Sequence, residues 1–463
     1  MHSRRSFLRD SALLAGALGL AAPLDPVLAQ ALKRKRSAGY GPLKPVKDLT
    51  TGQALLKLPD GFSYRSFGWA DSPLDDGTAT PRAHDGMGIV HEANGVVTLV
   101  RNHEVVAASG AFGKSTPTYD ALAAGGTTTL RFDTRSGKVV DVRASLSGTI
   151  QNCAGGTTPW GSWLSCEEFV STASHAANFY DSRSHDMAGL KRDHGFVFEV
   201  PLKGRASAEP LLQMGQFRHE AATVFRPTGD VYLTEDASPA AGFYRFVPKR
   251  LGELARGGEL YMLKVPSQPD LRGDLPVGKR FKASWVKIEH PERGNSPGSN
   301  DGKGVQAQGF ADGAAQFTRV EGCYATQDRV YFTATNGGIA KSGQVFAYFP
   351  RSAEIELIFQ SKDAETIDSP DNLAVNPHGG LILCEDGKTR TDGQFLMGLS
   401  SDAELFRFAQ NNVVINEPIH GHQGDFRYTE WAGACFSADG KWLFANVYAP
   451  GFTVAISGPW ARG

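Results

Sequence analysis

Short apolar runs alternate with polar positions along most of the chain, and one loose pattern of this kind recurs six times. Each copy opens with a polar or thiol residue, continues through small apolar residues, and closes with an alternating strand that ends at a carboxylate or an amide. Turn signals such as Asn94-Gly95 and Asp439-Gly440 lie midway in most copies, which predicts two short strands joined as a β-hairpin. The copies cover residues 85–104, 153–168, 220–236, 321–336, 371–386 and 430–446.

Further strand-like runs lie between the copies, at residues 195–201, 242–249, 343–351 and 403–409. A unit of about four strands that recurs six times predicts an all-β fold, a six-bladed β-propeller with irregular insertions, in one domain over residues 50–463. A β-sandwich or a two-domain β protein also offers hairpins with polar ends, but six hairpins in order favour the propeller. The glycine- and serine-rich segment 293–304 is expected to be a loop that caps one face.

The polar ends of these hairpins are expected to meet at one place. The first and last residues of an antiparallel hairpin lie about 5 Å apart. The innermost strands of all blades run in one direction along the channel of a propeller, so the six hairpin ends open onto one face. The residues expected there are Glu104, Cys153, Glu168, Glu220, Glu235, Glu321, Asp371 and Glu385, with Asp236, Asp386 and Glu430 as further candidates. Alternation does not decide between Glu167 and Glu168, and Glu168 is favoured.

So many carboxylates predict bound cations, because like charges a few ångströms apart repel and would otherwise take up protons. Oxygen ligands in number suit calcium. A thiolate among them suits a softer transition metal such as iron. Two or more metal ions close together are the usual apparatus for phosphoryl transfer, so the pattern indicates a metal centre at one end of the channel.

The first residues predict a protein that is exported from the cytoplasm, and the composition argues against some classes of partner. The 463 residues carry 48 basic and 49 acidic side chains, which argues against nucleic acid as the main partner. Residues 1–31 combine Arg4-Arg5, a short apolar run and small residues, as in a cleaved signal read by the twin-arginine export machinery. Residues 32–49 are expected to be a flexible basic lead-in. No later run reaches the length of a transmembrane helix, so we expect no membrane anchor. We expect the protein in the periplasm or secreted, and as a monomer.

The cysteines and histidines have alternative interpretations. Five cysteines is an odd count for an exported protein, so at least one thiol stays free or binds a metal. A disulfide between Cys153 and Cys166 is the main competitor for the metal interpretation. The other three cysteines are expected in the core, and His103 and His219, beside candidate glutamates, are expected to be structural, since neighbouring residues of a strand face opposite sides.

Several motifs resemble the PhoX-type alkaline phosphatase family. They are "NCAGGTTPWGSWLSCEE", "RNHE", "FRHEA", "GFYRFVP" and "DSPDNLAVNPHGGLILCEDG", and the resemblance runs from about Thr50 to Asn446. It implies a six-bladed propeller that binds iron and calcium and hydrolyses phosphate monoesters in the periplasm. It also implies Cys153 as the thiolate ligand of iron and Arg319 as the clamp on phosphate. The carboxylate ligands of iron or calcium that it implies are Glu168, Glu235, Glu321, Asp371 and Glu385.

Two positions depart from the family pattern. Val320 replaces the proline of an Arg-Pro-Glu element, and the chain reads Asn-Val-Tyr-Ala-Pro at 446–450 where the family has Asn-x-Gln-His-Pro. Two alternatives to a phosphatase of small phosphorylated substrates remain: a calcium-dependent lactonase or ester hydrolase, and a non-catalytic propeller with structural metals. Neither alternative needs a thiolate, so the Cys153 motif separates them from the phosphatase.

Overall fold

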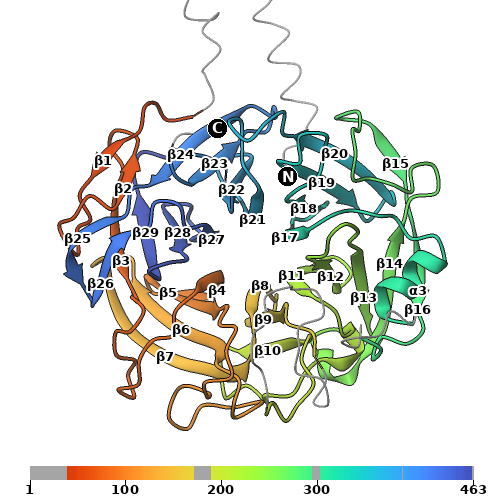
Figure 1. Ribbon diagram of the computed structural model, residues 1–463, viewed down its shortest axis with the longest axis horizontal. Helices are drawn as coiled ribbons and strands as arrows, with labels where there is room; N and C mark the ends of the chain where they lie inside the picture. The colour runs from red at the N-terminus through yellow and green to blue at the C-terminus, as the bar shows by residue number, and fades with distance from the viewer. Residues whose placement is uncertain (1–38, 172–188, 295–302, 388, 461–463) are drawn as a thin grey trace, which may run out of the picture. The chain divides into compact units, whose positions relative to one another are not determined.

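The computed structural model describes residues 39–171, 189–294, 303–387 and 389–460. Six antiparallel sheets stand around a common axis, which confirms the predicted six-bladed β-propeller (Figure 1). The export signal predicted at residues 1–31 lies outside the described residues. Within the predicted lead-in, Lys44–Val46 forms strand β1 and pairs with the sheet of the fifth blade. No helix among the described residues is both long and apolar enough to span a membrane.

Each blade begins with one of the six predicted hairpins, and its first strand lies nearest the axis (Figure 1). Blade 1 contains β4 (His84–Ala93), β5 (Val96–His103), β6 (Gly125–Asp133) and β7 (Lys138–Thr149). Blade 2 contains β8 (Asn152–Thr157), β9 (Ser162–Glu167) and β10 (Val197–Pro201). Blade 3 contains β11 (His219–Phe225), β12 (Asp230–Glu235), β13 (Phe243–Pro248), β14 (Gly258–Lys264) and β16 (Ser284–Ile288).

The remaining blades recruit strands from distant parts of the chain. Blade 4 contains β17 (Val320–Ala325), β18 (Val330–Ala334), β19 (Gln344–Phe349), β20 (Glu354–Gln360) and β15 (Arg280–Lys282). Blade 5 contains β21 (Pro370–Val375), β22 (Leu381–Glu385), β23 (Phe395–Leu399), β24 (Leu405–Asn411), β2 (Leu56–Leu58) and β1. Blade 6 contains β27 (Trp431–Phe436), β28 (Trp442–Val447), β29 (Phe452–Ser457) and β3 (Ser63–Phe67).

Few elements lie outside the blades. A separate hairpin joins β25 (Val414–Ile419) to β26 (His422–Asp425), and helix α3 covers Val305–Ala311. Short 3-10 helices cover Leu212–Met214 and Leu254–Arg256.

The ring is closed by pairing the two ends of the chain. Strand β3, from the N-terminal part, pairs with β29 near the C-terminus, with Ala455 opposite Arg65. Apolar side chains fill the spaces between blades, as where Phe243 of blade 3 stacks on Phe332 of blade 4 with ring centroids 4.2 Å apart. Closure and packing between blades together fix the six inner strands around the axis, which is what positions the site.

Candidate metal centre

Every inner strand carries a β-bulge just after it enters the channel. In blade 2, Asn152 pairs with Glu167 and Gly155 with Ser165, so two residues of β8 oppose one of β9. The same two-against-one irregularity occurs in the other five blades. A bulge re-aims the side chain of its first residue. In blades 1 to 5 that residue is acidic or a thiol: Asp85, Cys153, Glu220, Glu321 and Asp371.

Blade 6 departs from this pattern. Its bulge lies one residue later, at Gly433 and Ala434, because Ala432 still pairs with Asn446. Gly433 has a φ of +61°, and a Cβ there would come within 2.7 Å of the Asp85 carbonyl oxygen. The blade therefore has no acidic side chain at its bulge. Its acidic residue is Glu430, just before the strand.

One further pair of backbone groups extends each hairpin towards the end of the channel where the acidic residues lie. The residue after the second strand donates its N–H to the carbonyl oxygen of the residue that precedes the inner strand by one position. In blade 2 the Glu168 N–H donates to the Gln151 carbonyl oxygen at 2.9 Å, and in blade 5 the Asp386 N–H donates to the Ser369 carbonyl oxygen at 2.9 Å. The other four pairs are Glu104 with Ala83, Asp236 with Arg218, Thr335 with Arg319, and Tyr448 with Glu430. These pairs place Glu104, Glu168, Asp236 and Asp386 beside the residues of the bulges.

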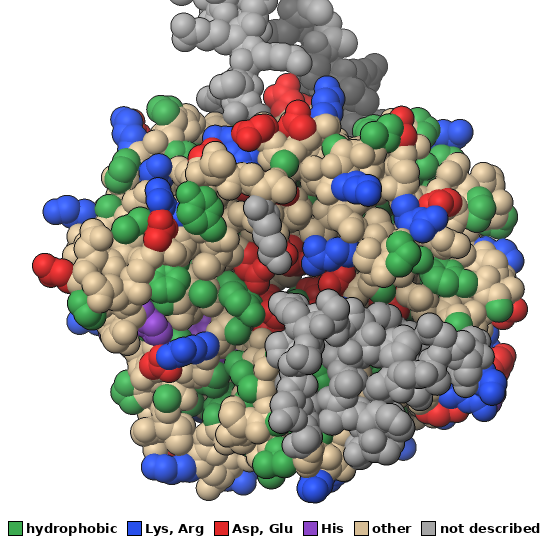
Figure 2. Space-filling view, viewed as in Figure 1, with side chains coloured by type: hydrophobic (Ala, Val, Ile, Leu, Met, Phe, Trp, Pro, Cys, Tyr) green, Lys and Arg blue, Asp and Glu red, His purple; other side chains and the backbone are tan. Residues whose placement is uncertain are grey.

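The acidic side chains gather in three groups, each with ligand atoms within 4.8 Å of one another. Cys153 belongs to two of them, and the third contains only carboxylates. The groups are Asp85 with Glu104 and Cys153; Cys153 with Glu168 and Glu220; and Asp371 with Asp386 and Glu430. Figure 2 shows acidic side chains in the hollow at the centre of this face. Asp236 and Glu321 adjoin them through Arg319.

The protonation equilibria of these groups reflect their burial. Burial, together with the charges of neighbouring carboxylates, raises the pKa of Asp85 and of Glu220 well above the usual value. Burial raises the pKa of Asp371 to about 7. Burial and the charge of Asp85 also raise the pKa of the Cys153 thiol, which donates a hydrogen bond to Asp85 Oδ2 at 3.2 Å. In the absence of cations, burial therefore favours the protonated forms of these groups.

The donor set fits bound metal ions. Glu220 Oε1 is buried and has no hydrogen-bond partner among the described residues, so a carboxylate oxygen points into the cluster unsatisfied. Such an oxygen is costly to bury unless a cation or a donor meets it. The thiol and the carboxylates around it offer the mixed ligands that a transition metal accepts, and the group with Asp371 offers oxygens alone, as calcium prefers.

Two guanidinium groups lie among the carboxylates. Arg218 donates to Glu168 Oε1 at 2.8 Å and to Asp236 Oδ2 at 3.3 Å. Arg319 Nε donates to Asp236 Oδ1 at 3.0 Å, and its NH2 lies 2.6 Å from Glu321 Oε1. Burial would raise the pKa of Asp236, but the charges of Arg319 and Arg218 outweigh it and lower that pKa. The Arg319 side chain is 29% exposed, so it is the more accessible of the two.

The structure places Glu235 and Glu385 outside the three groups, although both were predicted at the channel. Glu235 Oε2 accepts from the Gly242 N–H at 2.8 Å and from the Tyr244 hydroxyl at 2.9 Å. Glu385 accepts from the N–H of Asp368 at 3.0 Å and of Phe395 at 2.9 Å. Their neighbours Asp236 and Asp386 face the channel instead. Both glutamates hold together the strands of their own blades.

Glu167 has the same role in blade 2, since its carboxylate accepts from the backbone N–H groups of Ile150, Gly195 and Phe196. Glu168 is the residue of this pair that joins the cluster. Glu104, Cys153, Glu220 and Asp371 are likewise in the groups, and Glu321 contacts Arg319 at their edge.

Sequence reasoning missed four residues of this site: Asp85, Arg218, Gln151 and Tyr448. Gln151 Nε2 bridges Glu104 Oε1 at 3.1 Å and Glu168 Oε2 at 2.6 Å. Tyr448 hydrogen-bonds Glu104 through its side chain. Asp85 had a visible signal, because it opens the first repeat copy as Cys153 opens the second. Gln151 and Arg218, each one position before an inner strand, had no such signal in the sequence.

The other cysteines and the two histidines behave structurally. All five cysteines are free, so Cys153 and Cys166 form no disulfide. Cys166 is fully buried in an apolar cluster. His103 lies between Thr128 Oγ1 at 2.9 Å and the Arg82 carbonyl, and His219 contacts the Gly215 carbonyl at 2.9 Å. Of Cys153, Cys166, His103 and His219, only Cys153 is in the three groups.

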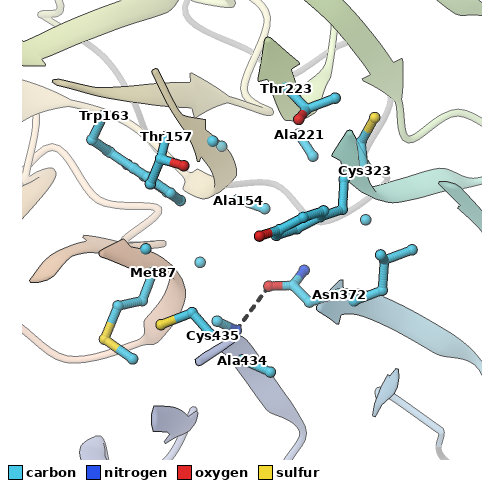
Figure 3. A pocket seen from close by; sticks show the side chains of 18 of the residues that line it. Met87, Ala154, Thr157, Trp163, Ala221, Thr223, Cys323, Asn372, Ala434 and Cys435 are labelled. Atoms are coloured by element: carbon cyan, nitrogen blue, oxygen red, sulfur yellow. Dashed lines mark hydrogen bonds between the residues drawn. The ribbon is translucent and has the colours of Figure 1, made fainter. Parts of the chain in front are cut away.

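A cavity of about 160 Å³ lies at the far end of the channel, and its lining combines small residues with larger ones such as Trp163 and Tyr324 (Figure 3). Each inner strand contributes a residue of its bulge, the second one in blades 1 to 5 and the first one in blade 6: Gly86, Ala154, Ala221, Gly322, Asn372 and Gly433. Asn372 Oδ1 accepts from the Gly433 N–H at 2.9 Å, which ties blade 5 to blade 6 across this end (Figure 3). The channel is therefore acidic at one end, and none of the described residues that line the cavity at its other end is acidic.

The sequence profile of the alkaline phosphatase PhoX family matches residues 38–146 and 141–451. No curated protein matches the chain. A solved gluconolactonase from Xanthomonas campestris is 13% identical, with 91% of this chain and 98% of that one covered and a TM-score of 0.39. A PQQ-bound aldose sugar dehydrogenase from Streptomyces coelicolor is 10% identical, with 78% and 95% covered and a TM-score of 0.35. Similarity to these two structures is too low to support a statement about activity.

Proposed function

Because the chain belongs to the alkaline phosphatase PhoX family, we propose that it is a metal-dependent phosphatase that hydrolyses phosphate monoesters outside the cytoplasm. The observation that carries this proposal is the combination at one channel end of a buried thiol, many carboxylates and two guanidinium groups. Carboxylates and the thiol suit metal ions, and guanidinium groups suit the phosphate oxygens.

Iron and calcium are the metals that this ligand set supports best. Iron would be held by Cys153 with carboxylates from Asp85, Glu104, Glu168 and Glu220, since a thiolate favours a transition metal. Calcium would be held by the group that offers only oxygens, Asp371, Asp386 and Glu430. Bound metals supply Lewis acidity towards phosphate oxygens and offset the charge of the carboxylates.

The side chains around the metals have separable roles. Arg319 would bind phosphate oxygens through its planar fork, because Asp236 and Glu321 hold its guanidinium group while part of it stays exposed. Arg218 would orient Glu168 and Asp236, which it bridges. Gln151 and Tyr448 would orient Glu104. No histidine of the described residues joins the three groups, and we propose no side-chain nucleophile.

Elemental analysis and an activity assay on the exported protein test the proposal. Protein purified from its export route should contain iron and calcium and hydrolyse p-nitrophenyl phosphate, and chelation should remove this activity. Calcium alone, with cleavage of lactones, would instead support the lactonase. Bound metal without turnover of any ester would support a non-catalytic propeller.

A cysteine variant tests the ligand assignment. Cys153→Ala should lose iron and lower kcat/KM on the order of 100-fold. Cys435→Ala is the matched control, because Cys435 is also a buried free thiol but lies in an apolar cluster. Iron retained in Cys153→Ala would show that another residue is the ligand.

The cellular location is part of the same proposal. We propose export through the twin-arginine machinery to the periplasm or medium, with the substrate a small phosphorylated molecule and the protein a monomer. Replacement of Arg4 and Arg5 by lysine should leave the protein in the cytoplasm, which fractionation and blotting would measure. Unimpaired export of that variant would point to a different route.

A further inference from the structure

A cavity of about 590 Å³ adjoins the metal centre on the side of blades 4 and 5. Arg319, the residue proposed to bind phosphate, forms one wall of it, and Asp386 of the all-carboxylate group forms another. The loops that follow β18, β20 and β22 supply the rest of the lining. A phosphate held by Arg319 would therefore have open space beside it, large enough for the alcohol portion of a substrate.

Two lysines in this lining are exposed cations. Lys341 follows β18 and Lys362 follows β20, and neither has an ion pair or side-chain hydrogen bond within the described ranges. Both side chains are exposed, so their ammonium groups can reach a ligand. Lys341 has a φ of +52°, a left-handed conformation that a lysine adopts only where surrounding contacts hold it.

The acidic residues of the cavity are, by contrast, already engaged. Asp363 Oδ1 accepts from the Thr366 N–H at 2.7 Å and from its hydroxyl at 2.8 Å. Asp368 Oδ2 accepts from the Thr389 N–H at 3.1 Å and from its hydroxyl at 2.7 Å. Asp386 lies within the metal-binding group. Asp363 and Asp368 keep their charges but are held by these hydrogen bonds, whereas the two ammonium groups have no hydrogen-bond partner among the described residues and can turn towards a ligand.

The loops that carry the lysines are tied to one another. The Ser361 N–H donates to the Gly343 carbonyl oxygen at 2.9 Å, and the Ser369 N–H donates to the Ser342 carbonyl oxygen at 3.2 Å. Each bond lies within two residues of one of the lysines. The backbone positions of Lys341 and Lys362 relative to each other are thus held by these bonds.

We propose that this cavity receives the alcohol portion of the phosphate monoester, and that Lys341 and Lys362 select alcohols that carry a second anionic group. The inference rests on the proposed phosphatase function and adds the class of substrate to it. Arg319 binds the phosphate that reacts, and the two ammonium groups attract the second negative charge. A substrate with an uncharged alcohol fills the same space without that attraction.

Two esters that differ in one group test this selection. 3-Phosphoglycerate carries a carboxylate where glycerol 3-phosphate carries a hydroxymethyl group, and the rest of the two molecules is the same. We expect kcat/KM of the metal-loaded protein to be roughly tenfold higher for 3-phosphoglycerate, as partly exposed ion pairs allow. Raising the ionic strength from about 0.05 M to about 0.5 M should reduce that ratio, because salt screens exposed charges.

Variants of the lysines assign the effect to the cavity. In the double variant Lys341→Met with Lys362→Met the ratio should fall to roughly one, and arginine at both positions should restore it. The ratio compares two esters on one protein sample, so loss of folded protein cancels. Lys441→Met is the control, since it removes one exposed lysine charge on the turn between β27 and β28, at the far end of the channel.

The outcomes separate this inference from the function on which it rests. Hydrolysis of both esters with a ratio near one, or a raised ratio that survives in the double methionine variant, would overturn the inference and leave the phosphatase intact. No hydrolysis of either ester or of p-nitrophenyl phosphate by metal-loaded protein would refute the phosphatase and the inference together.

Discussion

Thr234 is expected to hold two bulges of the metal centre at once. It lies on β12 opposite the bulge at Glu220 and Ala221 of its own blade. Its buried hydroxyl accepts from the Ala221 N–H at 2.9 Å and donates to the Glu321 carbonyl oxygen of the next blade at 2.6 Å. Thr234→Val keeps the shape of the side chain but removes both hydrogen bonds.

The magnitude follows from what the substitution leaves behind. Each hydrogen bond contributes about 1 kcal/mol net to stability, and a buried N–H without a partner costs about 1–3 kcal/mol. The Ala221 N–H would become such a group, because Thr234 is fully buried and water cannot replace it. We therefore expect the free energy of unfolding to fall by about 2–3 kcal/mol. Metal affinity should also fall, by roughly tenfold, because both bulges carry metal-centre carboxylates.

Urea unfolding at a fixed saturating concentration of metal, repeated after chelation, measures both effects. The loss measured after chelation reports the hydrogen bonds alone, and the additional loss with metal reports the weakened binding. Thr98→Val is the control. Thr98 is a buried threonine of β5 with no side-chain hydrogen bond among the described residues, and it should change stability by less than about 0.5 kcal/mol. An equally small change in Thr234→Val would refute the role of the hydroxyl.

Three further changes test the assignment of roles. Glu168→Gln should lower the metal content measured by elemental analysis, whereas Glu235→Gln should keep the metal and lower the free energy of unfolding by about 1–2 kcal/mol, because Glu235 accepts bonds within its blade. Arg319→Lys should lower kcat/KM for p-nitrophenyl phosphate by about 10- to 100-fold, since a lysine cannot make a bidentate contact with phosphate. The third concerns pH. Burial opposes a charge on His194, but Glu167 at 2.7 Å and Asp120 outweigh it and raise the pKa of His194 to about 9. The unfolded chain loses this proton near pH 6.5, whereas the folded state keeps it up to about pH 9. The protonated His194 therefore contributes about 3 kcal/mol to the free energy of unfolding. This contribution is full below pH 6.5 and is lost as the pH rises through about 9.

Each of these has an outcome that would contradict it. Metal lost from Glu235→Gln but kept in Glu168→Gln would reverse the two assignments. A loss in Arg319→Lys no greater than in the surface variant Arg272→Lys would remove Arg319 from phosphate binding. The pH dependence should be absent from His194→Gln, and chemical denaturation at several pH values would show whether it persists there.

The hydrophobic pattern alone determined the architecture. Six hairpins that alternate apolar and polar residues predict six blades, because strand periodicity and turn residues act locally and can be read from a single sequence. The same pattern located the acidic segments and the unusual thiol, so Cys153, Glu220 and Asp371 were already candidates. The channel is where such hairpin ends must meet once the ring closes.

Only the tertiary structure decided which side chain of each pair faces the channel. Side chains alternate along a strand, but alternation does not say which of two adjacent acidic residues faces the axis, so the sequence could not distinguish Glu235 from Asp236 or Glu385 from Asp386. It also could not bring Arg218 to Glu168, which lies fifty positions earlier in the chain. Those relations depend on contacts between blades, and no local pattern encodes them.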